Sequence, residues 1–250
     1  MPADTISWQL PVSVPPLGLT SLHVWRYRLD LDQLAPTNPA TLLSSDENER
    51  ASRFHFPIHR NRYIAGRAML RRILAAYQNT PPDSLTFSYA KYGKPSLPQT
   101  SGQNPVTFNS SHSQDLGVLV VGIGRTLGID VEAVRADFGG EEVAELNFAP
   151  AEFHSLRNLP VDIRPQAFFN CWTRKEAYIK ALGAGLQIPL DCFEVSLLPD
   201  EPAEFRRGVE EKWRLLSFSA EAAFQGALVY DGAQTMPEFY DASSLQALSA

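Results

Sequence analysis

The segment Gly128-Ile129-Asp130-Val131-Glu132 contains two carboxylates at a spacing that can bind a cation. In a β-strand, alternate residues point to opposite faces, so Ile129 and Val131 would lie on one face and Asp130 and Glu132 on the other. Neighbouring carboxylates repel each other unless water or a cation relieves the repulsion. Mg²⁺ binds carboxylate oxygens together with water and substrate phosphates. The segment therefore favours a magnesium site, with a solvated strand face as the alternative.

A third carboxylate lies within a helix that we expect over residues 165–182, ending at Gly183. Trp172, Glu176 and Lys180 are four residues apart and share one row of this helix. The simpler interpretation is a solvated stripe with an i,i+4 ion pair, which stabilises a helix by only about 0.3–0.5 kcal/mol. Combined with the two carboxylates of the strand, this row gives a set that suits a metal-bound pyrophosphate.

Positive charge is concentrated in one part of an otherwise acidic chain. Seven of the 22 Lys and Arg residues fall in one short segment: Arg50, Arg53, Arg60, Arg62, Arg67, Arg71 and Arg72. We expect one strongly positive face that attracts an anion. His112 follows a predicted strand, and its neighbouring hydroxyl groups could donate hydrogen bonds to a phosphate. A lone histidine in a turn is, however, more often structural. Lys94, in a Gly-Lys-Pro turn, is more often part of a surface loop.

Composition narrows the class of protein. A net charge of −6 and a pI near 5.4 argue against a general nucleic-acid binder. The histidines lack zinc-site spacing. Cys171 and Cys192 are too few for a disulfide framework, so we expect both to be reduced and buried, as in a cytoplasmic protein. The first 20 residues do not have the pattern of a signal peptide, and no segment has enough apolar residues to span a membrane.

The periodicity of the chain predicts an α+β protein. Strands are expected over 22–31, 85–89, 106–109, 116–123, 126–132, 192–197, 213–218 and 223–230, and helices over 40–53, 60–77, 141–147, 150–158 and 165–182. Gly124-Arg125 is expected to join two of the strands as a tight hairpin. The tail from Gly232 is weakly patterned. We expect two similar α+β halves, 1–120 and 121–250, with most metal and catalytic residues in the second half.

Three motifs of this chain closely resemble the signature motifs of Sfp-type 4′-phosphopantetheinyl transferases. They are Asn-Ser-Ser-His-Ser at 109–113, Gly-Ile-Asp-Val-Glu at 128–132 and Trp-Thr-Arg-Lys-Glu-Ala-Tyr-Ile-Lys at 172–180. Their order and separation also agree. The resemblance extends from about Glu47 to Phe193 and includes Gly93-Lys94-Pro95.

The resemblance implies a monomer of two pseudo-symmetric halves that binds coenzyme A in the cleft between them and modifies an apo acyl or peptidyl carrier protein. It implies a divalent cation, Mg²⁺ with Mn²⁺ as the alternative, bound by Asp130, Glu132 and Glu176. It also implies phosphate contacts from Lys180, a 3′-phosphate site at Arg50, Arg62 and His112, an adenine end at Lys94 and Pro95, Ser111 near the phosphates, and a general base at Glu152. Lys175 also matches the motif.

Two departures from the family pattern are present. Glu47 aligns with a lysine that the best-known member uses for the 3′-phosphate, so Arg50 and Arg62 would carry more of that contact. Thr173 replaces the usual serine and keeps the hydroxyl. Two other functions remain as alternatives: another Mg²⁺-dependent enzyme acting on nucleotides or phosphodiesters, and a binding module without catalysis.

Overall fold

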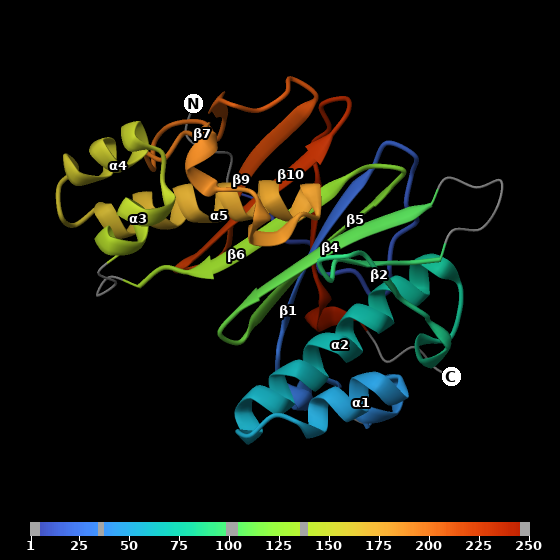
Figure 1. Cartoon of the computed structure of the whole chain (residues 1–250). Helices are drawn as coiled ribbons and strands as arrows, with labels where there is room; N and C mark the ends of the chain where they lie inside the picture. The colour runs from blue at the N-terminus through green and yellow to red at the C-terminus, as the bar shows by residue number, and fades with distance from the viewer. Residues whose placement is uncertain (1–5, 35–37, 99–104, 136–139, 246–250) are drawn as a thin grey trace.

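The computed structural model describes residues 6–34, 38–98, 105–135 and 140–245. Two β-sheets pack face to face in the middle of the molecule, and each outer face is covered by a long helix (Figure 1). Helix α2 (Pro57–Gln78) covers the first sheet and helix α5 (Arg164–Leu182) covers the second. Mixed helices and sheets confirm the predicted α+β class.

The first sheet has the strand order β11-β1-β5-β4. The strands are β1 (Leu22–Arg28), β4 (Val106–Ser113), β5 (Leu116–Ile123) and β11 (Glu238–Asp241). β11 runs parallel to β1, whereas the other neighbours are antiparallel. α2 begins earlier than predicted, because Pro57 occupies its first turn, where the missing N–H costs nothing.

The second sheet has the order β6-β10-β9. Its strands are β6 (Leu127–Ala133), β9 (Trp213–Glu221) and β10 (Phe224–Asp231), all antiparallel to their neighbours. Ile129 and Val131 of β6 are fully buried between the two sheets, as their alternation predicted. α5 ends where expected, at Gly183 with φ of 67°, in the left-handed conformation that glycine adopts without strain.

The predicted hairpin at Gly124-Arg125 is wrong. β5 pairs with β1 and β4, whereas β6 pairs with β10, so this turn carries the chain from one sheet to the other. Thr126 donates its backbone N–H to Asp231 Oδ1 at 2.7 Å, which directs the chain into the second sheet. The local sequence predicts a turn at this position, but it does not predict which strand pairs with which.

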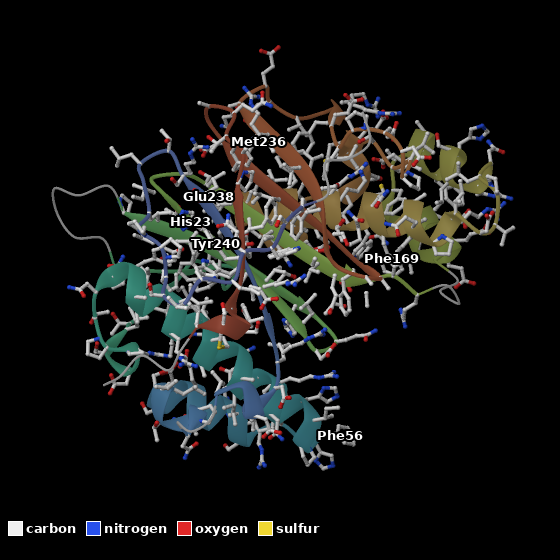
Figure 2. The ribbon with its side chains drawn as sticks, turned by 180° about the vertical axis from the view of Figure 1, so that it is seen from behind. His23, Phe56, Phe169, Met236, Glu238 and Tyr240 are labelled. Atoms are coloured by element: carbon white, nitrogen blue, oxygen red, sulfur yellow. The ribbon has the colours of Figure 1, made fainter. Side chains whose placement is uncertain are left out.

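The weakly patterned tail contains β11, which the sequence did not predict. Viewed from behind, Glu238 and Tyr240 of β11 lie beside His23 of β1 (Figure 2). The Tyr240 ring lies 4.9 Å from that of Trp25 and 5.2 Å from that of His23, measured between centroids. Aromatic packing therefore fixes a short strand, and the last strand of the chain joins the sheet that contains the first.

The smaller elements surround this framework. They are α1 (Ser45–Ser52), α3 (Glu141–Asn147), α4 (Pro150–Arg157), the ladder of β2 (Ser88–Tyr89) with β3 (Pro95–Ser96), and the ladder of β7 (Glu194–Val195) with β8 (Phe205–Arg207). Cys171 is buried as expected, but Cys192 is exposed. Among the described helices, none is both long and apolar enough to cross a membrane.

Candidate active site

The two sheets meet where β4 lies beside β6, and side chains rather than a backbone ladder join the two strands. Asn109 Oδ1 accepts the N–H of Ile129 at 2.8 Å, Ser111 Oγ donates to Asp130 Oδ1 at 2.8 Å, and Ser113 Oγ donates to Glu132 Oε2 at 2.7 Å. The three β4 residues are two apart and share one face. The Asn-Ser-Ser-His-Ser motif is therefore strand throughout, and His112 does not lie in a turn as predicted.

Asp130 lies at the centre of the β4–β6 junction, the place where these two strands meet. Its Oδ1 accepts hydrogen bonds from Lys180 Nζ at 2.6 Å and from Ser111 Oγ, and Lys180 Nζ also donates to Ser111 Oγ at 2.7 Å. Asp130 is only 3% exposed, and its Oδ2 is buried without a hydrogen-bond partner among the residues that the structure describes. A carboxylate oxygen in this position is costly unless a ligand or ion contacts it.

A close approach of α5 to β6 brings Lys180 and Glu176 to the junction. A Cβ atom at Gly128 would lie 2.0 Å from the carbonyl oxygen of Ala177, so only glycine permits this approach. Lys94 Nζ then donates to the carbonyl oxygens of Leu127, Lys180 and Ala181. Burial lowers the pKa of Lys94 to about 8. Lys94 thus joins the end of α5 to β6 through its ammonium group.

Negative charge exceeds positive charge at the junction. Burial and the neighbouring Asp130 and Glu132 carboxylates raise the pKa of Glu176 to about 7, against the opposing effect of Lys180. Burial also raises the pKa of Glu132, with a smaller contribution from Asp130. Lys180 therefore offsets only part of the charge of three carboxylates.

These residues fit a divalent cation by their chemistry. Among the described residues, no three His, Cys, Asp or Glu side chains are already arranged around a common point, and Lys180 pairs with Asp130 at 2.6 Å. The Asp130 and Glu132 carboxylates nevertheless contribute to the raised pKa of Glu176. Three oxygen ligands, surplus negative charge and the unpartnered Asp130 Oδ2 are features that a hard cation such as Mg²⁺ would satisfy.

Next to the junction is a cavity of about 620 Å³ between α2 and β4. Arg50, Arg62, Ser111 and His112 line it, so the structure brings these four predicted residues together. Partial burial and the positive charges of Lys180 and Arg62 lower the pKa of His112. The cavity is therefore electropositive beside an electronegative cluster, which suits a ligand that has several phosphates.

The sequence missed several residues of this cavity, among them Phe54, His59, Tyr63 and Ser113. Tyr63 stacks near Phe54, with ring centroids 5.3 Å apart, and Arg50 lies over the Tyr63 ring at 5.5 Å. The period of two would have identified Ser113 if the strand had been predicted to continue past Asn109.

The expected positive face is smaller than predicted. Glu47 is 2% exposed and pairs with both Arg67 and Arg71, and its contact with Arg71 Nε measures 2.6 Å. Arg72 is also buried, and Arg53 pairs with Glu49. The glutamate that departs from the family pattern therefore neutralises two arginines inside the fold, and Arg50 and Arg62 remain for a ligand in the cavity.

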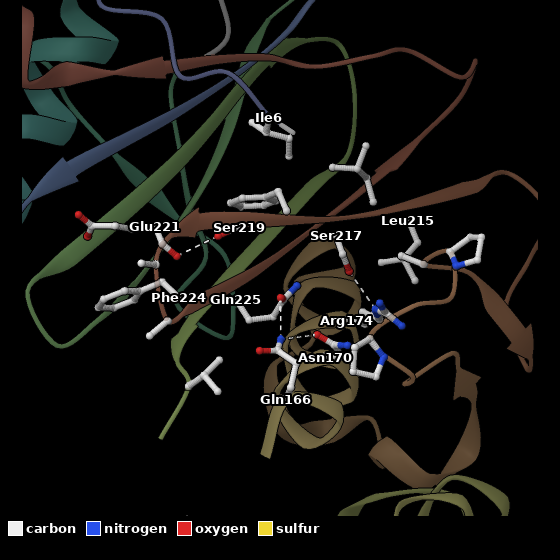
Figure 3. A pocket seen from close by; sticks show the side chains of 18 of the residues that line it. Ile6, Gln166, Asn170, Arg174, Leu215, Ser217, Ser219, Glu221, Phe224 and Gln225 are labelled. Carbon is white, nitrogen blue, oxygen red and sulfur yellow. Dashed lines mark hydrogen bonds between the residues drawn. The ribbon is translucent and has the colours of Figure 1, made fainter. Parts of the chain in front are cut away.

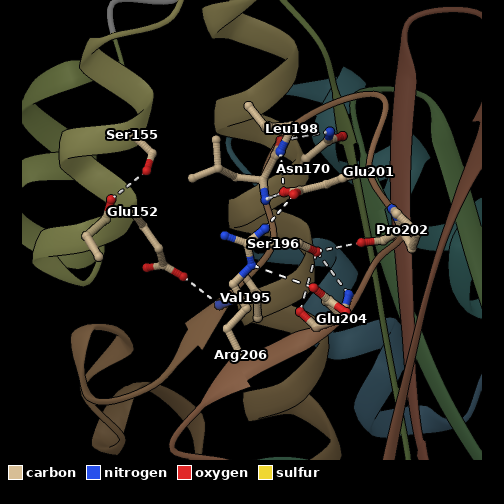
Figure 4. A network of polar contacts seen from close by, with 12 residues as sticks. Glu152, Ser155, Asn170, Val195, Ser196, Leu198, Glu201, Pro202, Glu204 and Arg206 are labelled. Carbon is tan, nitrogen blue, oxygen red and sulfur yellow. Dashed lines mark hydrogen bonds and ion pairs between the residues drawn. The ribbon is translucent and has the colours of Figure 1, made fainter.

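Glu152 and Lys175 do not lie with the other predicted site residues. Glu152 is 4% exposed, and one of its oxygens accepts the N–H of Val195 at 2.7 Å (Figure 4). Its other oxygen accepts the N–H of Ala149 at 2.8 Å. Lys175 is fully buried, pairs with Glu152 at 2.8 Å, and donates to two backbone carbonyls. These contacts hold α4, α5 and β7 together and leave neither group facing the cavity.

Two other predicted positions have structural roles. Pro95 lies in the short β2–β3 ladder opposite Tyr89 and, like Lys94, is not among the residues that line the cavity. Thr173 is fully buried, and its Oγ1 donates to the Phe169 carbonyl at 2.8 Å. A serine hydroxyl could make the same bond within α5, so we expect the replacement of serine by threonine to have a mild effect.

Comparison with known proteins identifies the family of this chain. A family model described as the 4′-phosphopantetheinyl transferase superfamily matches residues 126–229, and one described as the N-terminal part of 4′-phosphopantetheinyl transferase matches residues 37–123. The two matches meet at the 124–126 crossover between the sheets.

Three relatives are each named as a 4′-phosphopantetheinyl transferase. HetI of Nostoc sp. is 39% identical over 90% of this chain and 95% of its own length. The psf-1 protein of Bacillus pumilus is 30% identical over 80% of this chain and 82% of its own, and Sfp of Bacillus subtilis strain 168 is 29% identical over 64% and 69%. The chain therefore belongs to the 4′-phosphopantetheinyl transferase superfamily and is an enzyme of the Sfp type.

Replacing Glu176 with glutamine is expected to stabilise the metal-free protein at alkaline pH. The pKa of Glu176 is about 7 in the folded protein and near 4.5 unfolded, so stability falls as pH rises from 4.5 to 7 and stays low above that range. Glu176→Gln removes this penalty, a gain on the order of 1–3 kcal/mol at pH 8 that vanishes near pH 4.

Urea denaturation in EDTA at both pH values measures this effect. Glu145→Gln, on an exposed face of α3, is the control and should change little at either pH. Equal stability of wild type and Glu176→Gln at pH 8 would show that neither burial nor the neighbouring carboxylates penalise the charged form of Glu176.

Proposed function

We propose that this protein transfers the 4′-phosphopantetheine group of coenzyme A to a serine of an apo acyl or peptidyl carrier protein and releases 3′,5′-ADP. One observation carries the proposal: a carboxylate cluster around Asp130 directly adjoins an electropositive cavity, through Ser111 and Lys180. The substrate has a pyrophosphate and a separate 3′-phosphate, which match these two neighbouring regions in charge.

The carboxylates are proposed to hold a divalent cation, Mg²⁺ or Mn²⁺, through Asp130, Glu132 and Glu176. Such an ion supplies positive charge that stabilises a pyrophosphate during phosphoryl transfer. Lys180, bound to Asp130 and beside Ser111, supplies a fixed cation at the cavity end of the cluster. Arg50, Arg62 and His112 then bind the 3′-phosphate and orient the nucleotide.

The reaction forms one P–O bond and breaks another. The serine oxygen of the carrier protein bonds to the phosphorus that bears the pantetheine arm, and the bond to the 3′,5′-ADP oxygen breaks. The serine proton must leave with the attack. Glu152 is bonded through both oxygens, whereas Glu176 accepts no hydrogen bond from any residue that the structure describes. We therefore leave Glu176 free to bind the cation and assign proton acceptance to solvent rather than to Glu152.

Intact-protein mass spectrometry tests the proposed reaction. A panel of apo acyl and peptidyl carrier proteins is incubated with this protein, coenzyme A and Mg²⁺, with EDTA as the control. The expected result is a metal-dependent gain of one phosphopantetheine on at least one carrier. No gain on any carrier, combined with retained binding of coenzyme A, would favour a binding module instead.

Arg62→Ala is expected to reduce the preference for coenzyme A over 3′-dephospho-coenzyme A. A hydrogen bond to a charged group contributes about 1.5–3 kcal/mol, so the preference should fall by roughly 10- to 100-fold. The measurement compares kcat/KM for the two substrates. Arg53→Ala removes the same charge from an exposed arginine paired with Glu49 and should leave the preference unchanged. If the preference is unaltered in Arg62→Ala, the 3′-phosphate is bound by residues other than Arg62.

A further inference from the structure

A second cavity, of about 720 Å³, lies along the free edge of β9 and shares no lining residue with the cavity at Ser111 and His112. One wall is the first half of α5 and the opposite wall is β9 (Figure 3). The segment 199–203, the turn 222–225 and Trp8 complete it. Its volume is within the range of small-molecule sites.

A buried guanidinium group reaches this cavity without a counter-ion. Arg174 is 2% exposed, and its Nε donates to Ser217 Oγ at 2.9 Å while its Nη1 donates to the Ser196 carbonyl at 2.5 Å and to Ser196 Oγ at 2.9 Å. Its Nη2 donates to no residue that the structure describes, and Arg174 forms none of the described ion pairs. Burial lowers the pKa of Arg174 only to about 10, so the group is a cation at neutral pH.

A buried cation without a counter-ion is costly, and Arg174 lines a cavity where an anion can relieve that cost. Ser217 adds a second donor, because its oxygen accepts from Arg174 while its own proton is given to no described residue. Figure 3 shows Gln166 and Asn170 along the same side of α5 as Arg174. Gln166 donates to Asn170 at 2.9 Å and to Gln225 at 3.0 Å, so these amides are largely occupied by one another.

The surroundings limit the anion to a single charge. Glu201 and Glu204 act electrostatically on Arg174 and would repel a second negative charge. Glu201 itself accepts the N–H groups of Leu197 and Leu198 and pairs with Arg206, so it does not neutralise Arg174 directly (Figure 4). The remaining walls include the apolar residues Val134, Pro199, Pro202, Leu215 and Phe224, together with Arg26 and Glu221, which pair with Asp241 and Arg28.

We propose that this cavity is a binding site for a small organic monocarboxylate with an apolar body. The carboxylate accepts hydrogen bonds from Arg174 Nη2 and from the Ser217 hydroxyl, and the apolar body packs against Leu215 and Phe224. The site is distinct from the coenzyme A site, and the proposal holds whether or not the protein acts on carrier proteins.

Titration of the full-length protein with paired ligands tests the site. Hexanoate and benzoate are the probes, and hexanamide and benzamide are their uncharged controls. The Trp8 indole N–H, which donates to the Ser219 carbonyl at the cavity wall, is followed in ¹H–¹⁵N spectra and assigned with Trp8→Phe. We expect a saturating shift with a carboxylate Kd near or below about 1 mM and at least about tenfold weaker binding of each amide.

Variants then assign the contacts. Arg174→Met and Ser217→Ala should each weaken binding of the better carboxylate, Arg174→Met by at least about tenfold. If Arg174→Met does not fold, Ser217→Ala tests the binding site instead. Ser217→Ala should fold, because it removes only one hydroxyl from a partly exposed strand position. Arg125→Met, which removes an arginine bound to Ala233 and Thr235, is the charge-matched control and should bind as wild type does.

Three outcomes would overturn the proposal: equal affinity for an acid and its amide, no saturating shift at Trp8 up to about 20 mM carboxylate, or unchanged affinity in the deciding variant. Tighter binding of phenyl phosphate than of benzoate would overturn the assignment to a monocarboxylate.

Discussion

Asp130→Asn is expected to reduce transfer of phosphopantetheine by roughly 10³-fold or more while the fold is retained. Asparagine has the size of aspartate and can still accept the hydrogen bonds of Ser111 and Lys180, so the β4–β6 junction should persist. The variant loses the charge on a carboxylate whose Oδ2 has no hydrogen-bond partner in the described part of the chain. If Asp130 Oδ2 binds the cation that contacts the substrate, the negative charge of Asp130 is needed for the reaction but not for folding.

Steady-state rates at saturating Mg²⁺ and isothermal titration with Mg²⁺ and coenzyme A measure this effect. Asp115→Asn is the matched control, because Asp115 is a half-exposed aspartate that pairs with Arg28 on the surface. The control should keep wild-type rates. A rate for Asp130→Asn within about tenfold of wild type, with unchanged Mg²⁺ dependence, would show that the carboxylate cluster is not part of the reacting centre.

Glu152→Gln is expected to destabilise the protein strongly while the folded enzyme stays active. The substitution leaves the Lys175 ammonium, which is fully buried, without its counter-ion. Breaking a buried ion pair from one side costs about 3–5 kcal/mol. Unfolding by urea at pH 7.5 measures the loss, and activity at low temperature is expressed per folded molecule. We expect that specific activity to stay within about threefold of wild type.

This prediction separates a structural glutamate from a general base. Loss of a general base would reduce the rate by about 10²–10⁴-fold in molecules that remain folded. The double variant Glu152→Gln, Lys175→Met removes both charges and should recover part of the stability. Glu141→Gln is the control, since it breaks an exposed pair with Arg164 and should cost no more than about 1 kcal/mol. A stable but inactive double variant would support the assignment of Glu152 as the general base.

The polar strand β4 explains why the site forms at the contact between the two sheets. Asn109, Ser111 and Ser113 would normally weaken a strand prediction, because such residues favour turns. Here they replace a backbone ladder, and each bonds to β6. The strand that supplies these side chains also presents His112 to the adjoining cavity, so one segment connects the carboxylates with the phosphate-binding region.

The sequence alone determined the features that depend on local periodicity and on residue spacing. The alternation in 128–132 put Ile129 and Val131 in the core and the carboxylates on the other face, and the helix ending at Gly183 was predicted within one residue at each end. The motifs also identified the family that the relatives confirm. These results follow because strand alternation and helix termination are set by a residue and its near neighbours in the chain.

Only the tertiary structure decided which partner each charged residue has. The sequence grouped Lys175 with Glu176 and Arg67 with Arg62, yet Lys175 pairs with Glu152 in the core and Arg67 with Glu47. The strands on either side of Gly124 also do not pair with each other: β5 pairs with β1 and β4, and β6 pairs with the distant strand β10. Charge pairing and strand pairing depend on which surfaces meet in three dimensions and on how deeply each group is buried, and neither is a property of a local segment.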